Sequence, residues 1–430
     1  MKGMFITELD RPWHESPFLL QGFSLETDED LIALQQCCKY VYIDPGRSKH
    51  ALSTHGVSGS GADDSGVDHL MMQRDIQQAQ WKPEAVADRE KLVAAARKVH
   101  DSLGLPNDFV DYEITSPVEE ELQVARQVHS ELEASVTEAL EGFSSGSKLD
   151  VDEVKSSTNH LVESMIRNPD ASFLLSRLKD QDAYSYSHSI DASVLAIMFG
   201  RHLGLTESEL NKLALGVLLL DIGKLKLPPA LLDKKGKLQL AEIRILRKHV
   251  DFSVQVLTET PGIDPEVLSV IAYHHERVDG CGYPKGMKGQ EIPVYARIAA
   301  IVDFYDAYTH SRPYRPAHTS SQAINALYNG SGSQFQPELV EEFIQCLGVY
   351  PTGSLVLLSS GEVGIVIEQN PLRRLRPQIL LVRDADKNEI EMPYNCDLEV
   401  ELVDKKGKRL FIESSLKPGD FGVSADDFYL

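Results

Sequence analysis

The 430-residue sequence lacks the marks of a membrane-spanning or secreted protein. No apolar run approaches the roughly 18–20 residues needed to span a bilayer. The first residues, MKGMFITELDRPWHESP, have neither the apolar stretch nor the small-residue cleavage site of a secretory signal. The five cysteines show no metal-clip spacing, and the adjacent pair Cys37–Cys38 is a poor disulfide candidate. We therefore expect a protein without a transmembrane segment that works in the reducing cytoplasm.

Positive charge is also scarce. The chain has 43 Lys and Arg against 65 Asp and Glu, which gives a formal net charge of −22. Such a balance argues against non-specific binding of a nucleic-acid polymer or an anionic membrane. Residues 224–248 are a local exception, with eight Lys or Arg and two acids. A solvated helix face is the ordinary explanation of such a run, and a pocket for a small anionic ligand is the alternative.

The length and the changes of pattern predict a multidomain protein. Residues 51–80 are rich in Gly, Ser and Asp, which is typical of a linker. After LGVYPTGS the apolar spacing changes from a helical period to a period of two. We expect a small N-terminal α/β domain at 1–50, a flexible linker at 51–83, a helical connector at 84–147, an all-α domain at 148–347 and a small β module at 348–430.

Helix starts carry specific signals. Thr206 with Glu209, and Ser116 with Glu119, have the spacing of capping boxes, and Pro117 is expected at the first helical position. An Asp cap before Pro265 predicts another start. The helix expected at 116–142 is amphipathic and is a candidate for homodimerisation, although such helices more often pack within their own chain.

Residue types that bind metals recur between 182 and 315. Taken singly each is weak evidence, because a lone helical histidine is more often a surface or satisfied core residue. Their context is stronger, since an acid or histidine pair within an apolar helix is costly to bury without a partner. A shared divalent cation would satisfy all of them at once. The set is His188, Asp221, His249, His274, His275 and Asp303.

The order HS…LDIGK…KH…HHERVDGCGYP…D…YDAYTHSRPYR resembles the HD-GYP subclass of the HD-domain metal-dependent phosphohydrolases. This resemblance covers residues 175–330, and ELDRPWHESPFLLQGF resembles a small domain of unknown function that often precedes such modules. It implies an all-α HD-GYP core with a two-metal site, usually of iron or manganese. The implied activity is hydrolysis of cyclic di-GMP to pGpG, and often on to GMP.

The resemblance also implies a role for each residue. One metal would be held by His188, Asp221, Asp303 and the histidine of the HD motif, and the other by Asp221, His249, His274 and His275. Two such cations lower the pKa of a bridging water and clamp the phosphodiester oxygens. Asp221, Lys224 and Asp306 are the implied catalytic residues. Those implied to bind the nucleotide are Asp182, Lys224, Tyr283, Arg312 and Arg315. Tyr184 stands where some members carry a glutamate that helps to bind a third metal.

One position departs from this pattern. The HD dyad reads Leu220-Asp221, and leucine cannot bind a metal. We therefore expect one well-formed metal position and a second weakened by the loss of a nitrogen ligand. Two interpretations follow: a cyclic di-GMP phosphodiesterase with reduced activity, or a catalytically inactive sensor or adaptor that binds the nucleotide or a signalling protein. A hydrolase for another nucleotide or phosphate ester is a more distant third, and the GYP segment argues against it.

Overall fold

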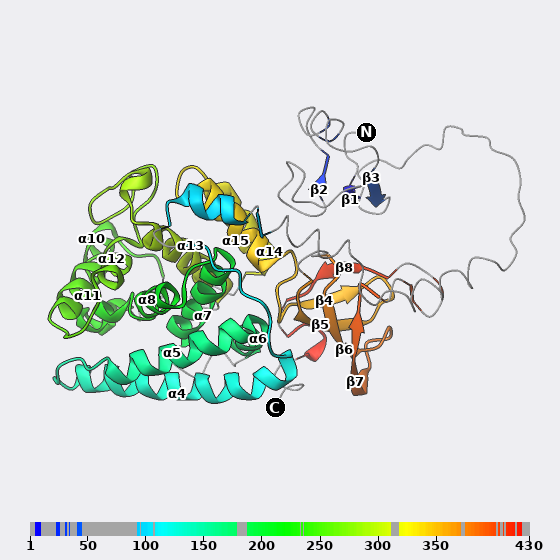
Figure 1. Cartoon of the computed structure of the whole chain (residues 1–430), viewed down its shortest axis with the longest axis horizontal. Coiled ribbons are helices and arrows are strands. Elements are labelled where there is room, and N and C mark those ends of the chain that lie inside the picture. Colours follow the sequence, from blue (N-terminus) through cyan, green and yellow to red (C-terminus); the bar gives the residue numbers. More distant parts are fainter. Residues whose placement is uncertain are drawn as a thin grey trace, which may run out of the picture. The chain divides into compact units, whose positions relative to one another are not determined.

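The computed structural model describes residues 5–9, 23–25, 31, 34, 41–44, 93–94, 96–105, 108–178, 187–232, 234, 236–310, 318–370, 375–400, 403–404, 407, 410–417 and 419–423 (Figure 1). The chain divides into two compact units, residues 1–95 with 371–375, and residues 96–370 with 376–430. In the first unit, strand β1 (Phe5–Leu9) pairs antiparallel with β2 (Phe23–Ser24) and β3 (Val41–Asp44). The expected N-terminal α/β domain stays a prediction.

The second unit begins with a helical domain, as the sequence predicts. No helix among the described residues is long and apolar enough to cross a membrane. Among its described residues, the short 3-10 helices are η2 (Ile222–Lys226), η3 (Gly289–Glu291) and η4 (Asp420–Gly422). Residues 96–103 are helical, and the α-helices that follow in the described part of the unit are α4 (Val118–Ser144), α5 (Asp152–Arg167), α6 (Pro169–Leu178), α7 (Ser187–His202), α8 (Glu207–Leu218), α9 (Pro229–Leu232), α10 (Leu240–Leu246), α11 (His249–Thr258), α12 (Pro265–Tyr273), α13 (Val294–Thr309), α14 (Ser320–Gly330) and α15 (Pro337–Leu347).

Helix α7 lies at the centre of this domain. It packs against α8, α13 and α6, and residues 190–200 are buried without interruption. A helix buried on all sides needs apolar residues around its whole circumference, and most of the stretch IDASVLAIMFG is apolar. The polar residues at its start are therefore held in the protein interior. The same holds for α13, which carries Asp303 and Asp306 between buried apolar neighbours.

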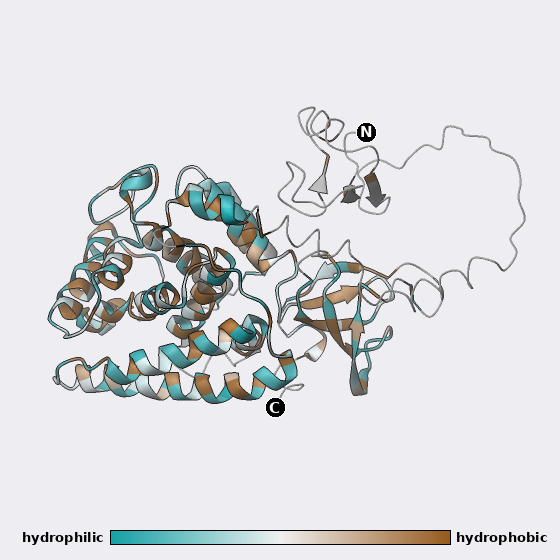
Figure 2. Ribbon diagram, viewed as in Figure 1, coloured by the Kyte–Doolittle hydropathy of each residue, from teal (hydrophilic) through white to brown (hydrophobic). Residues whose placement is uncertain are grey.

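The capping signals have mixed outcomes. The Thr206–Glu209 capping box is formed at the start of α8, and Asp264 caps α12 with Pro265 in the first turn. The prediction for α4 was wrong: Pro117 is the N-cap and no side chain caps this helix. In Figure 2, hydrophilic and hydrophobic residues follow one another along α4. Its buried face packs against α5 and α6 of the same chain.

The C-terminal part of the second unit is a small antiparallel β-sheet, as expected. Its strand order is β7-β6-β5-β4-β8. A core of Leu355, Val363, Ile365, Val382 and Val423 holds it together. The strands are β4 (Leu355–Leu358), β5 (Val363–Glu368), β6 (Gln378–Arg383), β7 (Glu389–Asp397) and β8 (Ile412–Ser415).

Candidate metal centre

Three histidines from two helix ends converge on one point. His249 is the first residue of α11, and His274 and His275 follow the end of α12, which packs against α11. Each offers one ring nitrogen, and these nitrogens all lie within 4.8 Å of one another. The Nε2 atoms of His249 and His275 are 3.2 Å apart. The structure therefore brings together three histidines that were predicted as metal ligands and that lie up to 26 residues apart in the sequence.

Backbone carbonyls fix which nitrogen of two of these rings carries the proton. The Nδ1 of His249 donates to the Leu246 carbonyl at 2.7 Å, and the Nδ1 of His274 donates to the Ile271 carbonyl at 2.8 Å. A carbonyl only accepts, so in the neutral ring Nε2 is left as an acceptor. Such second contacts typically orient metal-binding histidines. Bare nitrogens that converge in a buried place fit a divalent cation.

Electrostatics keeps His274 and His275 neutral. Burial lowers the pKa of His274, against the opposing charges of Asp303 and Asp221. Burial, with His274 and His249 beside it, lowers the pKa of His275 far below its usual value. Only the neutral imidazole binds a metal ion, so the site is prepared for a cation before one arrives.

Asp221 supplies the carboxylate of this centre. Its Oδ1 is 3.5 Å from the His249 Nε2, and its Oδ2 is 2.5 Å from the Lys224 Nζ. Burial alone would raise the pKa of Asp221, but the positive charge of Lys224 beside it outweighs burial and lowers the pKa well below its usual range. Asp221 is therefore an anion near neutral pH. The residue that the sequence puts at the end of an apolar run has a lysine and the histidine site as its partners.

The turn that carries Asp221 is fixed by one serine. The Ser253 hydroxyl, on α11, donates to the Leu220 carbonyl at 2.9 Å and accepts from the Gly223 amide at 2.8 Å. Gly223 is required for this close approach, because a Cβ there would lie 2.0 Å from the His249 carbonyl oxygen. The Leu220 side chain itself is buried, with 4% exposure. Leucine offers no ligand atom at this position of the HD dyad, as expected from the sequence.

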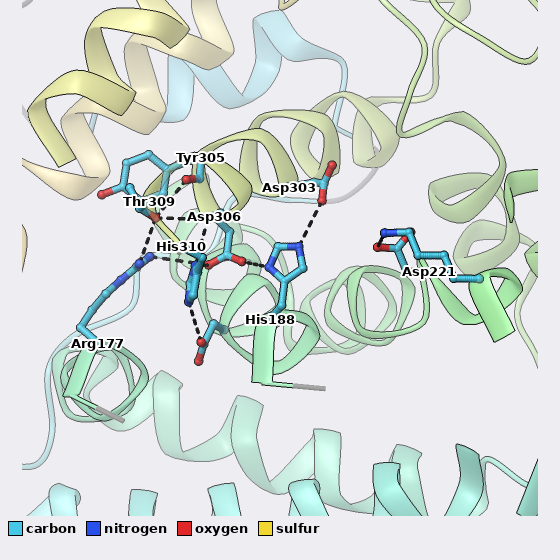
Figure 3. A network of polar contacts seen from close by, with 10 residues as sticks. Arg177, His188, Asp221, Asp303, Tyr305, Asp306, Thr309 and His310 are labelled. Carbon is cyan, nitrogen blue, oxygen red and sulfur yellow. Dashed lines mark hydrogen bonds and ion pairs between the residues drawn. The ribbon is translucent and has the colours of Figure 1, made fainter. Parts of the chain in front are cut away.

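His188, near the start of α7, is the next part of the site. Figure 3 shows its ring between Asp306 on one side and Asp303 on the other, with Asp221 lying beyond Asp303. The His188 Nδ1 pairs with the Asp306 carboxylate, and its Nε2 is 3.9 Å from the Asp303 Oδ1. Asp303 and Asp306, one helical turn apart on α13, therefore both face His188. Asp306 and His188 also form a cluster with His310.

The GYP loop lies against His275 of this centre. Tyr283 stacks on His275, with ring centroids 4.6 Å apart. The guanidinium carbon of Arg247 lies 4.6 Å from the Tyr283 ring centroid, which is a cation–π contact. Arg247 belongs to the basic stretch at 224–248, so at least one of its charges is at the site.

A buried carboxylate organises this loop. Glu276 is 3% exposed and accepts from the backbone amides of Lys285, Gly286 and Met287 at 2.6, 3.1 and 3.0 Å. Sequence reasoning missed this residue, although an acid directly after the histidine pair and before a Gly-rich turn was the available signal. It also missed Ser253, Arg247, Asp191, Arg177 and His310.

Four residues considered from the sequence lie outside the described part of the chain. They are Asp182, Tyr184, Arg312 and Arg315. The remaining expected site residues all lie on or beside the centre: His188, Asp221, Lys224, His249, His274, His275, Tyr283, Asp303 and Asp306. Their roles as ligands, catalysts or nucleotide contacts stay predictions.

Three known protein families match separate parts of the chain. Residues 171–339 match the HD domain family, which covers the site. Residues 2–154 match a domain of unknown function, DUF3391, and residues 355–422 match a KOW domain associated with the HD domain. HD-domain phosphohydrolases bind divalent metals, which agrees with the cluster of His249, His274 and His275.

Similar proteins include named phosphodiesterases. The cyclic di-GMP phosphodiesterase PA4108 of Pseudomonas aeruginosa is 33% identical over 276 residues, which cover 64% of this chain and 66% of that protein. The cyclic di-GMP phosphodiesterase response regulator RpfG of Xanthomonas campestris is 36% identical over 154 residues, 36% of this chain and 41% of that one. The match thus spans just under two thirds of the first relative and less than half of the second.

A third relative has a different named substrate, and a solved structure is more distant. The 3'3'-cGAMP-specific phosphodiesterase 2 of Vibrio cholerae is 38% identical over 143 residues, 33% of this chain and 27% of that one. The structure of Bd1817, an HDG"Y"P protein from Bdellovibrio bacteriovorus, covers 80% of this chain and 93% of its own at 16% identity with a TM-score of 0.42. At that similarity it carries no argument about function.

Proposed function

The chain belongs to the HD-GYP type of HD-domain proteins, and on that premise we propose that it is a metal-dependent phosphodiesterase that hydrolyses cyclic di-GMP to pGpG or GMP. One observation carries the proposal: the inward-facing nitrogens of His249, His274 and His275 meet beside the Asp221 carboxylate. This donor set suits a divalent first-row cation, with iron and manganese as our expectation. The relatives named as cyclic di-GMP phosphodiesterases support the choice of substrate.

The residues divide into two metal positions that share Asp221. His249, His274 and His275 complete the first, which has all its protein ligands. His188 and Asp303 belong to the second, where Leu220 gives no nitrogen. A bound divalent cation supplies Lewis acidity toward a phosphoryl oxygen and lowers the pKa of water. Because a position with fewer protein ligands binds more weakly, occupancy of the position at His188 and Asp303 would limit the activity.

The positively charged residues around Asp221 are proposed to bind the phosphodiester group. Lys224 holds Asp221 at 2.5 Å and is partly exposed, so its ammonium can turn to a phosphate oxygen while it stays beside the centre. Arg247, exposed and held against Tyr283, adds a second positive group at the loop. Asp306 orients His188 and is the proposed proton-handling acid. Asp182, Arg312 and Arg315 complete the proposed nucleotide contacts.

A hydrolysis assay on the full chain tests the proposal. Purified protein is given cyclic di-GMP under reducing conditions with Mn²⁺ or Fe²⁺, and 3'3'-cGAMP is run as a competing substrate. We expect turnover with metal and loss of turnover in His275→Ala, while His160→Ala, at an exposed histidine of α5, behaves as wild type. Turnover no higher than in a metal-free control would exclude phosphodiesterase activity. Faster turnover of 3'3'-cGAMP than of cyclic di-GMP would make 3'3'-cGAMP the preferred substrate.

A second candidate function rests on Leu220. A buried leucine at the HD position favours a sensor or adaptor that binds cyclic di-GMP, or a signalling protein, without hydrolysing it. Titration calorimetry with cyclic di-GMP in the presence of Mn²⁺ separates the two. Binding without turnover supports the sensor, and the absence of binding removes it. Cytoplasmic location, protein partners and homodimerisation stay predictions beside either function.

A further inference from the structure

Behind His188 lies a group of buried polar residues that the proposed reaction does not use. His310 follows the end of α13, Asp191 is on α7 and Arg177 is on α6. The His310 side chain is 11% exposed and that of Asp191 is 8% exposed. Figure 3 shows His310 and Arg177 on the side of Asp306 that faces away from Asp303. Buried ionisable groups are costly unless each meets a partner of opposite charge.

His310 connects two carboxylates. Its Nε2 is 3.0 Å from the Asp191 Oδ2. Its Nδ1 is 2.9 Å from the Asp306 carbonyl oxygen and 3.0 Å from the Asp306 Oδ1. Nδ1 donates, because a carbonyl only accepts, and in a charged imidazolium Nε2 would donate to Asp191 as well. Burial opposes that charge, but Asp306 and Asp191 raise the pKa of His310 to about 10.

The Asp306 carboxylate has a cationic neighbour at each of its oxygens, although only Oδ2 makes a hydrogen bond among the described residues. Oδ2 pairs with the His188 Nδ1, while Oδ1 faces His310 at 3.0 Å and a nitrogen of Arg177 at 3.9 Å. Arg177 is itself fixed by donation to the Thr309 hydroxyl at 3.1 Å. The charges of His310 and Arg177 on the Oδ1 side favour the orientation in which Oδ2 accepts the Nδ1 proton of His188. The His188 Nε2 then points to Asp303 and the proposed second metal position.

We propose that His310 is a positioning residue for the metal position formed by His188, Asp303 and Asp221. It holds Asp306, and Asp306 holds the His188 ring with Nε2 toward the ion. The inference rests on the metal site of the proposed function and adds to it a support that the ligands alone do not give. Because Leu220 supplies no ligand, the His188 imidazole is the only histidine ligand proposed for this metal position. Metal affinity at this position therefore depends strongly on the orientation of the His188 ring. Loss of such an outer contact typically weakens metal binding by about 10–100-fold.

The test is a Mn²⁺ titration of the metal-free full-length chain, with bound Mn²⁺ counted by electron paramagnetic resonance. The perturbation is His310→Phe, which keeps a ring of similar size and removes both donors. The proposal predicts that the weaker of two binding steps becomes about 10–100-fold weaker. The tighter step, at His249, His274 and His275, is unchanged. Equal binding in wild type and variant, or an equal loss at both steps, overturns the proposal.

A matched control breaks the same kind of contact elsewhere. His202, at the other end of α7, pairs with Glu342 at 2.8 Å. His202→Phe removes this pair and is expected to leave both Mn²⁺ steps as in wild type. A loss of the weaker step in this control would show a general effect of stability and would contradict a specific role for His310.

A conservative variant keeps the test decisive should His310→Phe not fold. The amide of His310→Gln donates to Asp306 or to Asp191 but cannot replace both ring contacts. It should weaken the same binding step by a smaller factor, and unchanged binding overturns the proposal. A wild-type chain that binds a single Mn²⁺ also overturns it, yet leaves a one-metal enzyme or sensor intact. Failure of hydrolysis and of cyclic di-GMP binding removes the proposed function without altering the Mn²⁺ result.

Discussion

Replacing Leu220 with histidine returns the expected nitrogen to the HD position. Leu220 is buried, so its side chain contributes about 1.5–3 kcal/mol to stability, and an unpaired imidazole in its place costs about 1–3 kcal/mol more. Without metal, Leu220→His should therefore lower the free energy of unfolding by about 2.5–6 kcal/mol. Free Mn²⁺ at a thousand times its Kd would raise the free energy of unfolding again by about 4 kcal/mol.

The assay compares denaturant unfolding with and without Mn²⁺, together with Mn²⁺ stoichiometry and cyclic di-GMP turnover. Leu220→His should be less stable than wild type in the absence of metal and gain more from Mn²⁺. It should also bind its second ion more tightly and turn over faster, because the weaker position regains a ligand.

Leu219→His is the matched control. Leu219 is the adjacent leucine and is as deeply buried, at 3% exposure, but it is not the residue that precedes the aspartate in the HD dyad. It should lose similar stability and gain neither Mn²⁺ affinity nor turnover. The reasoning is refuted if the two variants respond alike to Mn²⁺, or if Leu220→His binds no more Mn²⁺ than wild type.

Three further predictions concern the supports of the site and the stability of the fold. Gly223→Ala should abolish Mn²⁺ binding, because the new Cβ would lie 2.0 Å from the His249 carbonyl oxygen. Gly142→Ala is the control, since its Cβ meets no atom within 4 Å. Mn²⁺ binding that survives in Gly223→Ala would contradict this prediction. Glu276→Gln weakens three hydrogen bonds to loop amides and should lower the free energy of opening the loop by about 1–3 kcal/mol. The amides of residues 285–287 should then exchange hydrogen faster, and unchanged exchange would contradict the prediction. Burial raises the pKa of Asp170 from 3.8 to about 6, a shift that corresponds to roughly 3 kcal/mol. Because the native state keeps this proton longer than the unfolded chain, its stabilisation is complete below pH 3.8 and is lost as the pH rises toward 6. Asp170→Asn should therefore raise the free energy of unfolding at pH 7 and flatten its pH profile, and an unchanged profile would contradict the assignment.

Local signals in the sequence predicted those parts of the fold that depend on neighbours along the chain. The Thr206–Glu209 box is formed because both partners lie in one helical turn. Ser116 has the same spacing to Glu119, but its carbonyl accepts from the Asn168 side chain, and Pro117 takes the N-cap position. The Ser116 hydroxyl donates to the Pro117 carbonyl instead, so local spacing alone did not predict how this helix starts. Strand β8 was not expected either, since IESS shows little alternation.

The candidate site divides in the same way. Its histidines and aspartates are visible because a polar residue in an apolar helix is conspicuous, and their order carries the family resemblance. Their support is not visible: His310 and Asp191 are 119 residues apart, and each reads alone as an ordinary helical residue. Ser253 and Glu276 act through backbone groups, which leave no mark on side-chain spacing. The sequence therefore predicts ligands better than the contacts that orient them.

The central claim is that His249, His274, His275 and Asp221 together hold a divalent cation. The most direct test is an anomalous difference map at the manganese edge, from crystals of the full chain grown with Mn²⁺. The account predicts a strong peak among the three Nε2 atoms and the Asp221 carboxylate, with a weaker peak at most beside His188 and Asp303. No peak at the three histidines, or a single peak elsewhere, would contradict it.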